Sequence, residues 1–206
     1  MGFTQGRMFI VLEGIDGSGT TTQLDRLAAH LTARGRQVHT TREPSQGPIG
    51  RLLREILLGG HRLPDGAGVD GLAMALLFAA DRRDHVTREI EPALARGLDV
   101  ISDRYLLSSL AYQAQEADRA WVAGLARDLR VPDLTILLDV PVPVAAARRR
   151  AAGRPDERYD ADEIQTRVAA RYRELAAQTP NTVVLDASGS IEQVTAAIAQ
   201  TVAPLF

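Results

Sequence analysis

A glycine-rich segment lies between a short apolar run and a longer helical pattern near the start of the chain. The run Met8–Leu12, "MFIVL", is typical of a buried strand, and "GIDGSGTTT" follows it at positions 14–22. Apolar residues then recur at helical spacing as far as Leu31. Glycines in such a turn let the backbone approach a ligand, and the amides at the start of a helix attract anions. The segment therefore predicts a strand, an anion-binding turn and a helix in direct succession.

The same alternation of apolar runs and helical patterns continues along the chain. Further strands are expected at 38–41, 100–102, 134–138 and 183–185, and helices at 49–58, 72–95 and 191–202. Pro92 is expected to kink or divide the helix at 72–95, and the stretch 61–71, rich in Gly, Pro and Asp, is expected to be a loop. Continuous apolar strands separated by helices predict a parallel sheet, here of five strands, covered on both faces. With no internal repeat or dividing linker, residues 1–206 are expected to form one α/β domain.

The composition argues against several classes of protein. Hydrophobic residues make up 45% of the 206 residues, which argues against disorder, and a net charge of −2 gives no reason to expect nucleic-acid or membrane binding. The chain has no cysteine and therefore no disulfide. We see no signal peptide after Met1 and no run of about 18 apolar residues. A cytoplasmic protein is expected.

The glycine-rich turn departs from the phosphate-binding pattern GxxxxGK[ST] at one position. Gly14, Gly19 and Thr21 fit, but Thr20 stands where the pattern has lysine. All 24 residues counted as Lys+Arg are arginine, so no lysine elsewhere in the chain can replace it. A cationic side chain at the phosphates must then be an arginine or, less readily, a histidine. Thr21 stands where the pattern supplies a hydroxyl to Mg²⁺, although the turn alone also fits an ordinary strand-to-helix connection.

Several stretches along the chain together resemble the thymidylate kinase (dTMP kinase) family. They are "LEGIDGSG", "TREP" at 41–44, "LLFAADR" at 76–82, "SDRYLLSSLAYQ" at 102–113, "RVAARYRELA", and "LDA" at 185–187. The resemblance covers about residues 8–200 and implies a P-loop NTPase-like, three-layer fold with a mobile lid at about 148–160. It also implies transfer of the γ-phosphoryl group of ATP to dTMP, giving dTDP, with Mg²⁺ as cofactor. Family members are usually homodimers, and the helix from Leu72 is a candidate interface.

Phe78 and Arg82 are four residues apart on an expected helix and therefore share a face. An aromatic ring can stack on a flat base, and a guanidinium can hydrogen-bond to the carbonyl edge of that base. The resemblance implies that these two residues bind thymine. The alternative for Phe78 is a place in the hydrophobic core.

Asp103, Arg104 and Tyr105 follow the third expected strand, at the end of the sheet where ligands of open α/β folds bind. Arg104 can form a fork to the phosphate of the acceptor nucleotide. Asp103 can orient Mg²⁺ or its water, and Asp16 is placed to hold the sugar 3′-hydroxyl or metal-bound water. A structural ion pair is the usual alternative for an Asp-Arg pair, but the position at the strand end favours a functional role.

Tyr105, Ser108 or Ser109, and Tyr112 are expected on one helical face. The resemblance implies that Ser109 faces the base and that Tyr112 crowds the sugar 2′ position, with helix packing as the alternative for both. Further dTMP contacts are implied for Arg42, Glu43, Pro44 and Gln113. Contacts with ATP are implied for Gly14, Gly17, Ser18, Gly19, Thr20, Thr21 and Thr22.

An arginine-rich stretch, from Arg148 to Arg158, resembles the lid of the family. Some members carry a catalytic arginine in the glycine-rich turn, where this chain has Gly17, so the lid-type arrangement common in bacteria is implied. We expect at least one lid arginine to reach the transferred phosphoryl group, with Arg149 and Arg154 favoured over the others. A solvated basic face is the alternative. Together with backbone amides, Mg²⁺ and Arg104, such an arginine would neutralise the transition state.

Two other functions remain open from the sequence. A kinase for a different nucleotide could use the same fold, although the Phe78/Arg82 pair and "DRYLLSSLAYQ" argue against it. A nucleotide-binding pseudokinase, inactivated by Thr20, is the alternative from a different class. The retention of acceptor and lid residues argues against that alternative.

Overall fold

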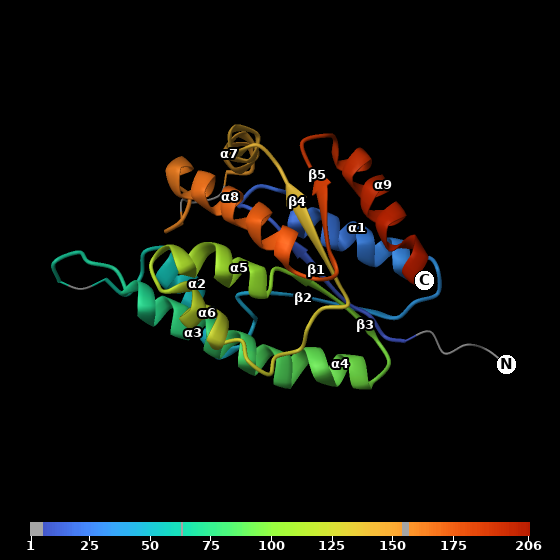
Figure 1. Ribbon diagram of the computed structural model, residues 1–206, viewed down its shortest axis with the longest axis horizontal. Helices are drawn as coiled ribbons and strands as arrows, with labels where there is room; N and C mark the ends of the chain where they lie inside the picture. The colour runs from blue at the N-terminus through green and yellow to red at the C-terminus, as the bar shows by residue number, and fades with distance from the viewer. Residues whose placement is uncertain (1–5, 63, 154–156) are drawn as a thin grey trace.

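Strands and helices alternate along the part of the chain that the computed structural model describes, residues 6–62, 64–153 and 157–206 (Figure 1). The strands are β1 (Phe9–Glu13), β2 (Val38–Arg42), β3 (Asp99–Asp103), β4 (Leu134–Asp139) and β5 (Thr182–Asp186). The α-helices are α1 (Thr20–Thr32), α2 (Pro48–Leu57), α3 (Gly71–His85), α4 (Glu91–Ala95), α5 (Leu106–Tyr112), α6 (Arg119–Gly124), α7 (Val142–Ala151), α8 (Asp162–Gln178) and α9 (Ile191–Val202).

The five strands form one parallel sheet in the order β2-β3-β1-β4-β5. At its centre β1 pairs with β3 and β4, so that Leu12 lies beside Asp103 and Ile136. Every residue of β1 is buried, which explains why Phe9–Leu12 form a continuous apolar run and not an alternating pattern; the last residue of the strand, Glu13, is a buried carboxylate. The predicted five-stranded parallel sheet is confirmed.

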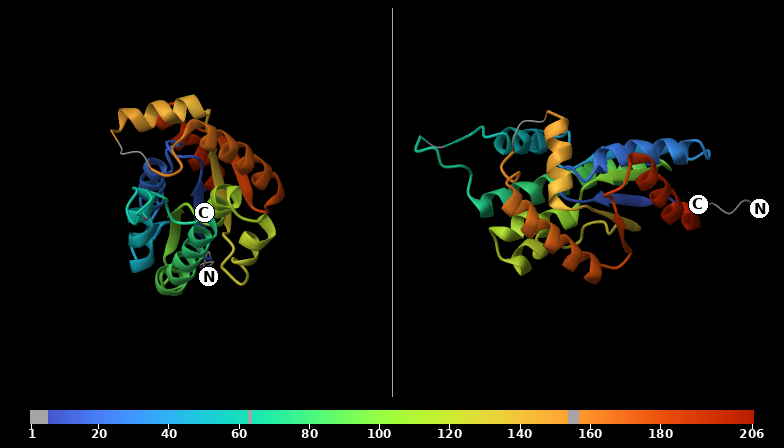
Figure 2. Two further views of the ribbon diagram at one scale, coloured as in Figure 1. Left: turned by 90° about the vertical axis from the view of Figure 1, so that its left-hand side faces the viewer. Right: turned by 90° about the horizontal axis from the view of Figure 1, so that it is seen from above.

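Helices cover both faces of this sheet (Figure 2). Ile10 and Leu12 belong to the hydrophobic cluster that includes Leu27 of α1. Phe9 and Val11, whose side chains point the opposite way, pack in a second cluster with residues of α4 and of the segment before it. The two sets of alternate side chains on β1 thus produce the three layers of the fold.

The helical stretch from Gly71 to Ala95 is divided, as the sequence predicts, but the change begins before Pro92. Residues Val86–Ile90 form a π-helical turn between α3 and α4, and Pro92 lies in the first turn of α4. A proline ring clashes with the carbonyl four residues earlier, here that of Arg88, and the wider π turn accommodates this. The disturbance therefore extends N-terminally from the proline.

The fold brings the turn after β1 to the end of the sheet where β2 and β3 also terminate. Helix α1 begins at Thr20, directly after that turn. The expected loop 61–71 ends where Asp70 caps α3 by accepting hydrogen bonds from the amides of Leu72 and Ala73. Within the described ranges, every helix is too short or too polar to cross a membrane.

Candidate active site

A cavity of about 750 Å³ opens at the carboxyl ends of β1, β2 and β3. Of the residues singled out from the sequence, those that line it are Asp16, Gly17, Ser18, Gly19, Thr20, Thr21, Thr22, Arg42, Glu43, Pro44, Phe78, Arg82, Asp103, Arg104, Ser108, Tyr112, Gln113, Arg148 and Arg149. Gly14 and Ser109 do not contribute to the lining, and Arg154 lies outside the described residues. Segments far apart in the sequence thus meet at one cavity.

The turn after β1 is tightly packed at two of its glycines. A Cβ on Gly14 would lie 2.5 Å from Ser18 Oγ and 2.9 Å from the carbonyl oxygen of Leu138. Gly17 has a φ of +90°, and a Cβ there would collide with the carbonyl of Ala145. Gly14 therefore allows the close packing of the turn on the side away from the cavity. The unpaired backbone amides at the start of α1, with the positive end of the helix dipole, adjoin the cavity.

Thr21 and Asp103 form a polar pair beside this turn. Thr21 Oγ1 donates a hydrogen bond to Asp103 Oδ2 at 2.5 Å. Asp103 Oδ1 and Ser18 Oγ are buried and have no hydrogen-bond partner within the described chain, which is uncommon for buried polar atoms. Mg²⁺ typically binds one or two carboxylates together with water and substrate phosphates, so a larger protein cage is not required. The described residues contain no such cage, and the Thr21–Asp103 pair fits this ion.

Arg104 is the centre of a buried polar network. Its Nη2 donates to Asp16 Oδ1 at 2.7 Å, and its Nη1 donates to the Tyr172 hydroxyl at 3.3 Å. Its φ of +73° is costly for a residue with a side chain, and its amide is held by the Leu12 carbonyl at 2.8 Å. Burial lowers the pKa of Arg104, but Tyr112, Asp16 and other acidic groups outweigh this and raise it well above its usual value. The guanidinium therefore stays charged.

Asp16 is held from several directions. Besides Arg104, its carboxylate accepts hydrogen bonds from the Tyr112 hydroxyl at 3.0 Å and from Gln165 Nε2 at 2.9 Å. Its amide donates to Gln165 Oε1 at 3.2 Å. Burial, reinforced by Asp16, raises the pKa of Tyr112, so the phenol remains a protonated donor. Asp16 is therefore fixed between the sheet, α5 and α8.

Glu13 joins this network at the end of β1 and was not among the predicted site residues, although it lies within the stretch "LEGIDGSG". It is fully buried at the end of β1. Its carboxylate accepts from the Ser108 hydroxyl at 2.7 Å, the Tyr172 hydroxyl at 3.0 Å and the Tyr105 amide at 2.9 Å. Burial raises the pKa of Glu13, and the hydrogen bonds and Arg104 only partly offset that effect. The same Ser108 and Tyr172 hydroxyls reach Arg104, so Glu13 helps to position it.

Phe78 and Arg82 both line the cavity from α3. Arg82 is 2% exposed and is held by acceptors on three sides. Its Nε donates to Glu43 at 2.9 Å, and its Nη2 donates to the Tyr105 carbonyl at 3.0 Å and to Ser109 Oγ at 2.9 Å. Ser109 thus lies behind Arg82, away from the cavity where a base contact was expected.

Tyr105 lies apart from the cavity, so the expectation that it shares a helical face with Tyr112 is wrong. It precedes α5 as its N-cap and has an extended backbone, with a φ of −167°. Its ring packs edge-on against Phe9 with centroids 5.1 Å apart, and its hydroxyl donates to the Arg130 carbonyl at 3.0 Å. Because α5 begins one residue later, Tyr105 joins the core on the opposite side of the sheet.

Two arginines of α7 flank the glycine-rich turn. Arg149 Nη1 donates to the Asp16 carbonyl at 2.7 Å, and its Nε lies 3.3 Å from Asp160 Oδ1. Arg148 makes only longer bonds to backbone carbonyls, at 3.5 Å to Ser18, 3.4 Å to Ser188 and 3.1 Å to Gly189, and pairs with no carboxylate in the described chain. By contrast, Arg158 turns away to the Val69 carbonyl at 2.6 Å and to Glu116 at 2.8 Å.

Several cavity residues were missed by sequence reasoning. Arg54 of α2 lines the cavity and donates to the carbonyls of Pro44 and Ser45, each at 2.6 Å. Burial lowers the pKa of Arg54. Tyr159 also lines the cavity, and its carbonyl accepts from Gln165 Nε2 at 2.8 Å. Neither residue belongs to a recognisable motif, so only the tertiary fold reveals it.

Comparison with known proteins agrees with this geometry. The family model described as thymidylate kinase matches residues 12–198. A probable thymidylate kinase of Thermococcus kodakarensis is 43% identical over 91% of this chain and 93% of its own length. A thymidylate kinase of Bifidobacterium longum is 45% identical over 93% of this chain and 95% of its own length. The match of the family model over most of the chain and the identity with these relatives show that the chain belongs to the thymidylate kinase family.

Proposed function

We propose that the cavity transfers the γ-phosphoryl group of ATP to dTMP and so forms dTDP. The observation that carries this proposal is the shared cavity: the phosphate-binding turn and the Phe78/Arg82 pair line the same space. Membership of the thymidylate kinase family identifies ATP as the donor and dTMP as the acceptor. A phosphate oxygen of dTMP forms a bond to the γ-phosphorus, and the bond from that phosphorus to the bridging oxygen of ADP breaks.

On the donor side, the turn and the N-terminus of α1 would bind the phosphates of ATP through backbone amides. Thr21 and Asp103 would hold Mg²⁺, which neutralises charge on the β- and γ-phosphates when bound. The unpaired buried Oδ1 of Asp103 supports this assignment. Gly17, Ser18, Gly19, Thr20 and Thr22 adjoin the same phosphates.

On the acceptor side, Arg104 would fork to the 5′-phosphate of dTMP. Its ion pair with Asp16 fixes the guanidinium before substrate arrives, so little ordering is required on binding. Asp16 and Tyr112 would then face the sugar, and Phe78 and Arg82 the base. The remaining acceptor-side contacts are assigned to Arg42, Glu43, Pro44, Ser108 and Gln113.

The charge missing at Thr20 would be supplied from α7. Arg148 and Arg149 both line the cavity, and both contact carbonyls of the glycine-rich turn. Arg149 is engaged by Asp160, whereas Arg148 has no carboxylate partner in the described chain and can turn toward a phosphate at lower cost. We therefore add Arg148 to Arg149 and Arg154 as the arginines that neutralise the transferred phosphoryl group.

A coupled assay with ATP, Mg²⁺ and a panel of acceptors tests the proposal. The expected result is turnover with dTMP well above that with dUMP, dCMP, dAMP and dGMP. Binding of ATP and dTMP without turnover would instead support a pseudokinase, and a preference for another acceptor would support a kinase for that nucleotide.

We further propose that the protein is a homodimer that joins through α3. Leu72 and Leu76 lie one helical turn apart on this helix and are 49% and 51% exposed. Light scattering after size exclusion should give twice the chain mass of 22.3 kDa. Leu76→Glu should shift the protein toward a monomer, and a monomeric wild-type protein would contradict this interface.

A further inference from the structure

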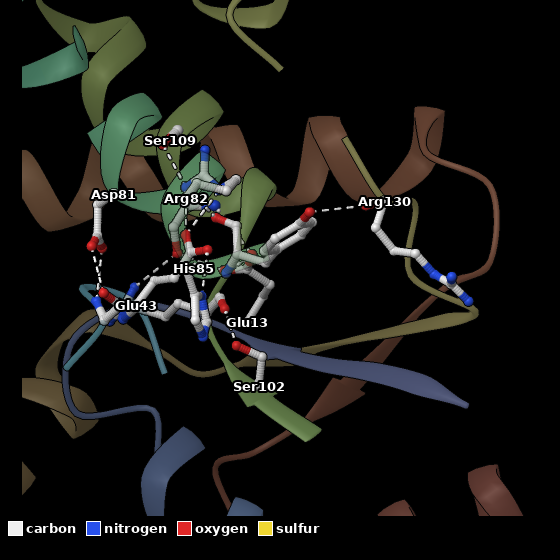
Figure 3. Close-up of polar contacts among 12 residues, drawn as sticks. Glu13, Glu43, Asp81, Arg82, His85, Ser102, Ser109 and Arg130 are labelled. Carbon is white, nitrogen blue, oxygen red and sulfur yellow. Dashed lines mark hydrogen bonds and ion pairs between the residues drawn. The ribbon is translucent and has the colours of Figure 1, made fainter. Parts of the chain in front are cut away.

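A second polar cluster lies behind the nucleobase side of the cavity. Figure 3 shows Glu43 of the segment after β2 between Arg82 and His85 of α3. His85 is 2% exposed, and the transfer step described above makes no use of it. A buried imidazole with polar partners on both nitrogens needs a reason beyond packing.

Both oxygens of the Glu43 carboxylate are engaged in this cluster. Oε2 lies 2.9 Å from Arg82 Nε and 2.8 Å from Arg82 Nη2. Oε1 lies 3.2 Å from His85 Nδ1. Because a carboxylate paired with arginine only accepts hydrogen bonds, this contact assigns the proton to Nδ1 of His85. His85 thereby prevents rotation of the carboxylate to which Arg82 is bound.

His85 is itself anchored on its far side. Its Nε2 lies 2.7 Å from the Thr41 hydroxyl on β2 and 3.6 Å from Glu89 Oε2. Glu89 also contacts His39 of β2 at 2.9 Å. These contacts tie the imidazole to the edge strand of the sheet, so its Nδ1 is held at a fixed position relative to Glu43.

Fixing Glu43 determines how Arg82 meets the cavity. Nε and Nη2 of Arg82 are occupied by Glu43, by the Tyr105 carbonyl and by Ser109. Nη1 has no hydrogen bond within the described chain, and Arg82 lines the cavity. Nη1 is therefore left to bind a ligand, and the hydrogen bonds of Nε and Nη2 fix the plane of the guanidinium.

We infer that His85 is a positioning residue that, through Glu43, orients Arg82 toward the carbonyl edge of the nucleobase. This inference deepens the proposed function and rests on it, because the base is taken to be the thymine of dTMP. The imidazole itself touches neither substrate. It acts on affinity for the acceptor and leaves the donor side unchanged.

Two substitutions separate the contacts of the imidazole. The amide nitrogen of asparagine corresponds to Nδ1, so His85→Asn keeps a donor for Glu43 and loses the Thr41 contact. The amide nitrogen of glutamine corresponds to Nε2, so His85→Gln keeps the Thr41 contact and loses the donor for Glu43. His85→Leu removes both, and His61→Asn on the exposed surface is the control.

Steady-state kinetics provides the first test. His85→Leu and His85→Gln should raise the KM for dTMP by roughly tenfold or more, the usual effect of losing a hydrogen bond to a charged group, and leave the KM for ATP within about twofold. His85→Asn should stay within about threefold of wild type. Equal effects of asparagine and glutamine, or parallel rises in both KM values, would overturn the inference. If His85→Leu does not fold, the asparagine and glutamine pair still decides.

A spectroscopic test does not depend on activity. The Nε–H signal of Arg82 in a ¹H–¹⁵N NMR spectrum should exchange slowly with water in the wild type and in His85→Asn, and much faster in His85→Gln. The Nε–H of Arg36, bound to Asp99 at 2.6 Å elsewhere, is the internal control. Arg82→Met and Arg36→Met identify the two signals. Unchanged exchange of Arg82 in His85→Gln would refute the positioning role, whereas absent kinase activity alone would refute only the proposed function.

Discussion

The two halves of the cavity are built in different ways. The acceptor half is an interlocked set of side chains, in which Arg104, Asp16 and Tyr112 are joined by hydrogen bonds of 2.7 and 3.0 Å. The donor half consists of a backbone turn and two α7 arginines that contact carbonyls of that turn, Arg149 at 2.7 Å to Asp16 and Arg148 at only 3.5 Å to Ser18. The only buried cavity oxygens without partners in the described chain also adjoin the donor half.

This difference indicates which half changes when substrates bind. In the proposed assignment, the acceptor half satisfies most of its polar groups internally and leaves Nη1 of Arg82 to the base, so dTMP would meet a site whose geometry is largely set before it binds. In the same proposal, phosphates would satisfy the backbone amides of the donor half and Arg148, and Mg²⁺ would bind beside Asp103, so the charges of this half would be balanced only with ligand present. Mutations in the acceptor half should therefore disrupt a network, whereas those in the donor half should act mainly on the rate.

The largest effect is expected for Arg104→Met, which breaks the acceptor network. We expect kcat/KM for dTMP to fall about 10²–10³-fold, since a preorganised donor to the attacking 5′-phosphate of dTMP is lost. The matched control is Arg173→Met, which removes an exposed arginine bound to Asp139 on the surface. Activity close to wild type in Arg104→Met would show that the acceptor half is not organised around this residue.

A smaller loss, about 10²-fold in kcat, is expected for Arg148→Ala or Arg149→Ala in the donor half. The lid charge is needed mainly as negative charge develops on the transferred group, so the Kd for dTMP should change little. Arg158→Ala is the control, because Arg158 binds Val69 and Glu116 instead of the turn. If kcat is intact in single alanine variants at Arg148, Arg149 and Arg154, the proposed compensation for lysine is wrong.

The same contrast explains what could be predicted from the sequence. The sheet and most elements follow from local apolar patterns, and the donor turn follows from glycines in one short segment. The π turn at Val86–Ile90 did not emerge, because it depends on how a helix accommodates Pro92. Likewise, Tyr105 was misplaced because a one-residue difference in the start of α5 sends its side chain to the other face of the sheet.

The acceptor half was only partly predictable, because its partners come from distant segments. Phe78 and Arg82 share a local helical face, which the sequence reveals. Glu13 lies in the stretch "LEGIDGSG", but its role depends on partners from α5 and α8, and Gln165 reaches Asp16 from 149 positions along the chain. Residues that position catalytic groups in this way are visible only in the folded structure.

The next effect concerns the base. Replacing Phe78 by alanine should weaken dTMP binding by roughly 1–3 kcal/mol, the usual value of base stacking on an aromatic ring, and leave ATP binding unchanged. Calorimetric titration of each nucleotide measures both. Phe206→Ala, at the far end of the chain over Arg36, is the control. Equal losses for both nucleotides would mean that Phe78 acts as core and that the acceptor half does not recognise the base through it.

Glu13 offers a test through stability. Its pKa is raised in the folded protein by burial, so between its usual value of 4.5 and the folded value the native state binds more protons than the unfolded state. The free energy of unfolding therefore falls as pH rises through this window, by about 1.4 kcal/mol for each unit of pKa difference. Urea titrations from acid pH up to pH 8 should show Glu13→Gln gaining stability relative to wild type as pH rises above 4.5.

The control for this experiment has the opposite sign. Hydrogen bonds at the start of α9, from its own amide and from Ser190, lower the pKa of exposed Glu192. Glu192→Gln should therefore lose, not gain, stability relative to wild type as pH rises from acid toward 4.5. A difference in the free energy of unfolding between Glu13→Gln and wild type that does not change with pH would contradict this prediction. It would mean that the Glu13 carboxyl does not titrate in this range.

The smallest effect is expected at Thr20, which tests whether the donor half is as complete as the acceptor half. An uncompensated loss of the lysine would cost about 10²–10³ in rate, so Thr20→Lys would recover that factor. Thr20 is 7% exposed at the start of α1, and Arg148 and Arg149 already place positive charge beside the same turn. We therefore expect Thr20→Lys to raise kcat by less than about tenfold.

Thr20→Arg, with a bulkier planar group, should obstruct the turn and weaken ATP binding. Turnover of the three proteins at saturating ATP, dTMP and Mg²⁺ decides. A gain of about a thousandfold for Thr20→Lys would show that the donor half is incomplete and would favour a pseudokinase.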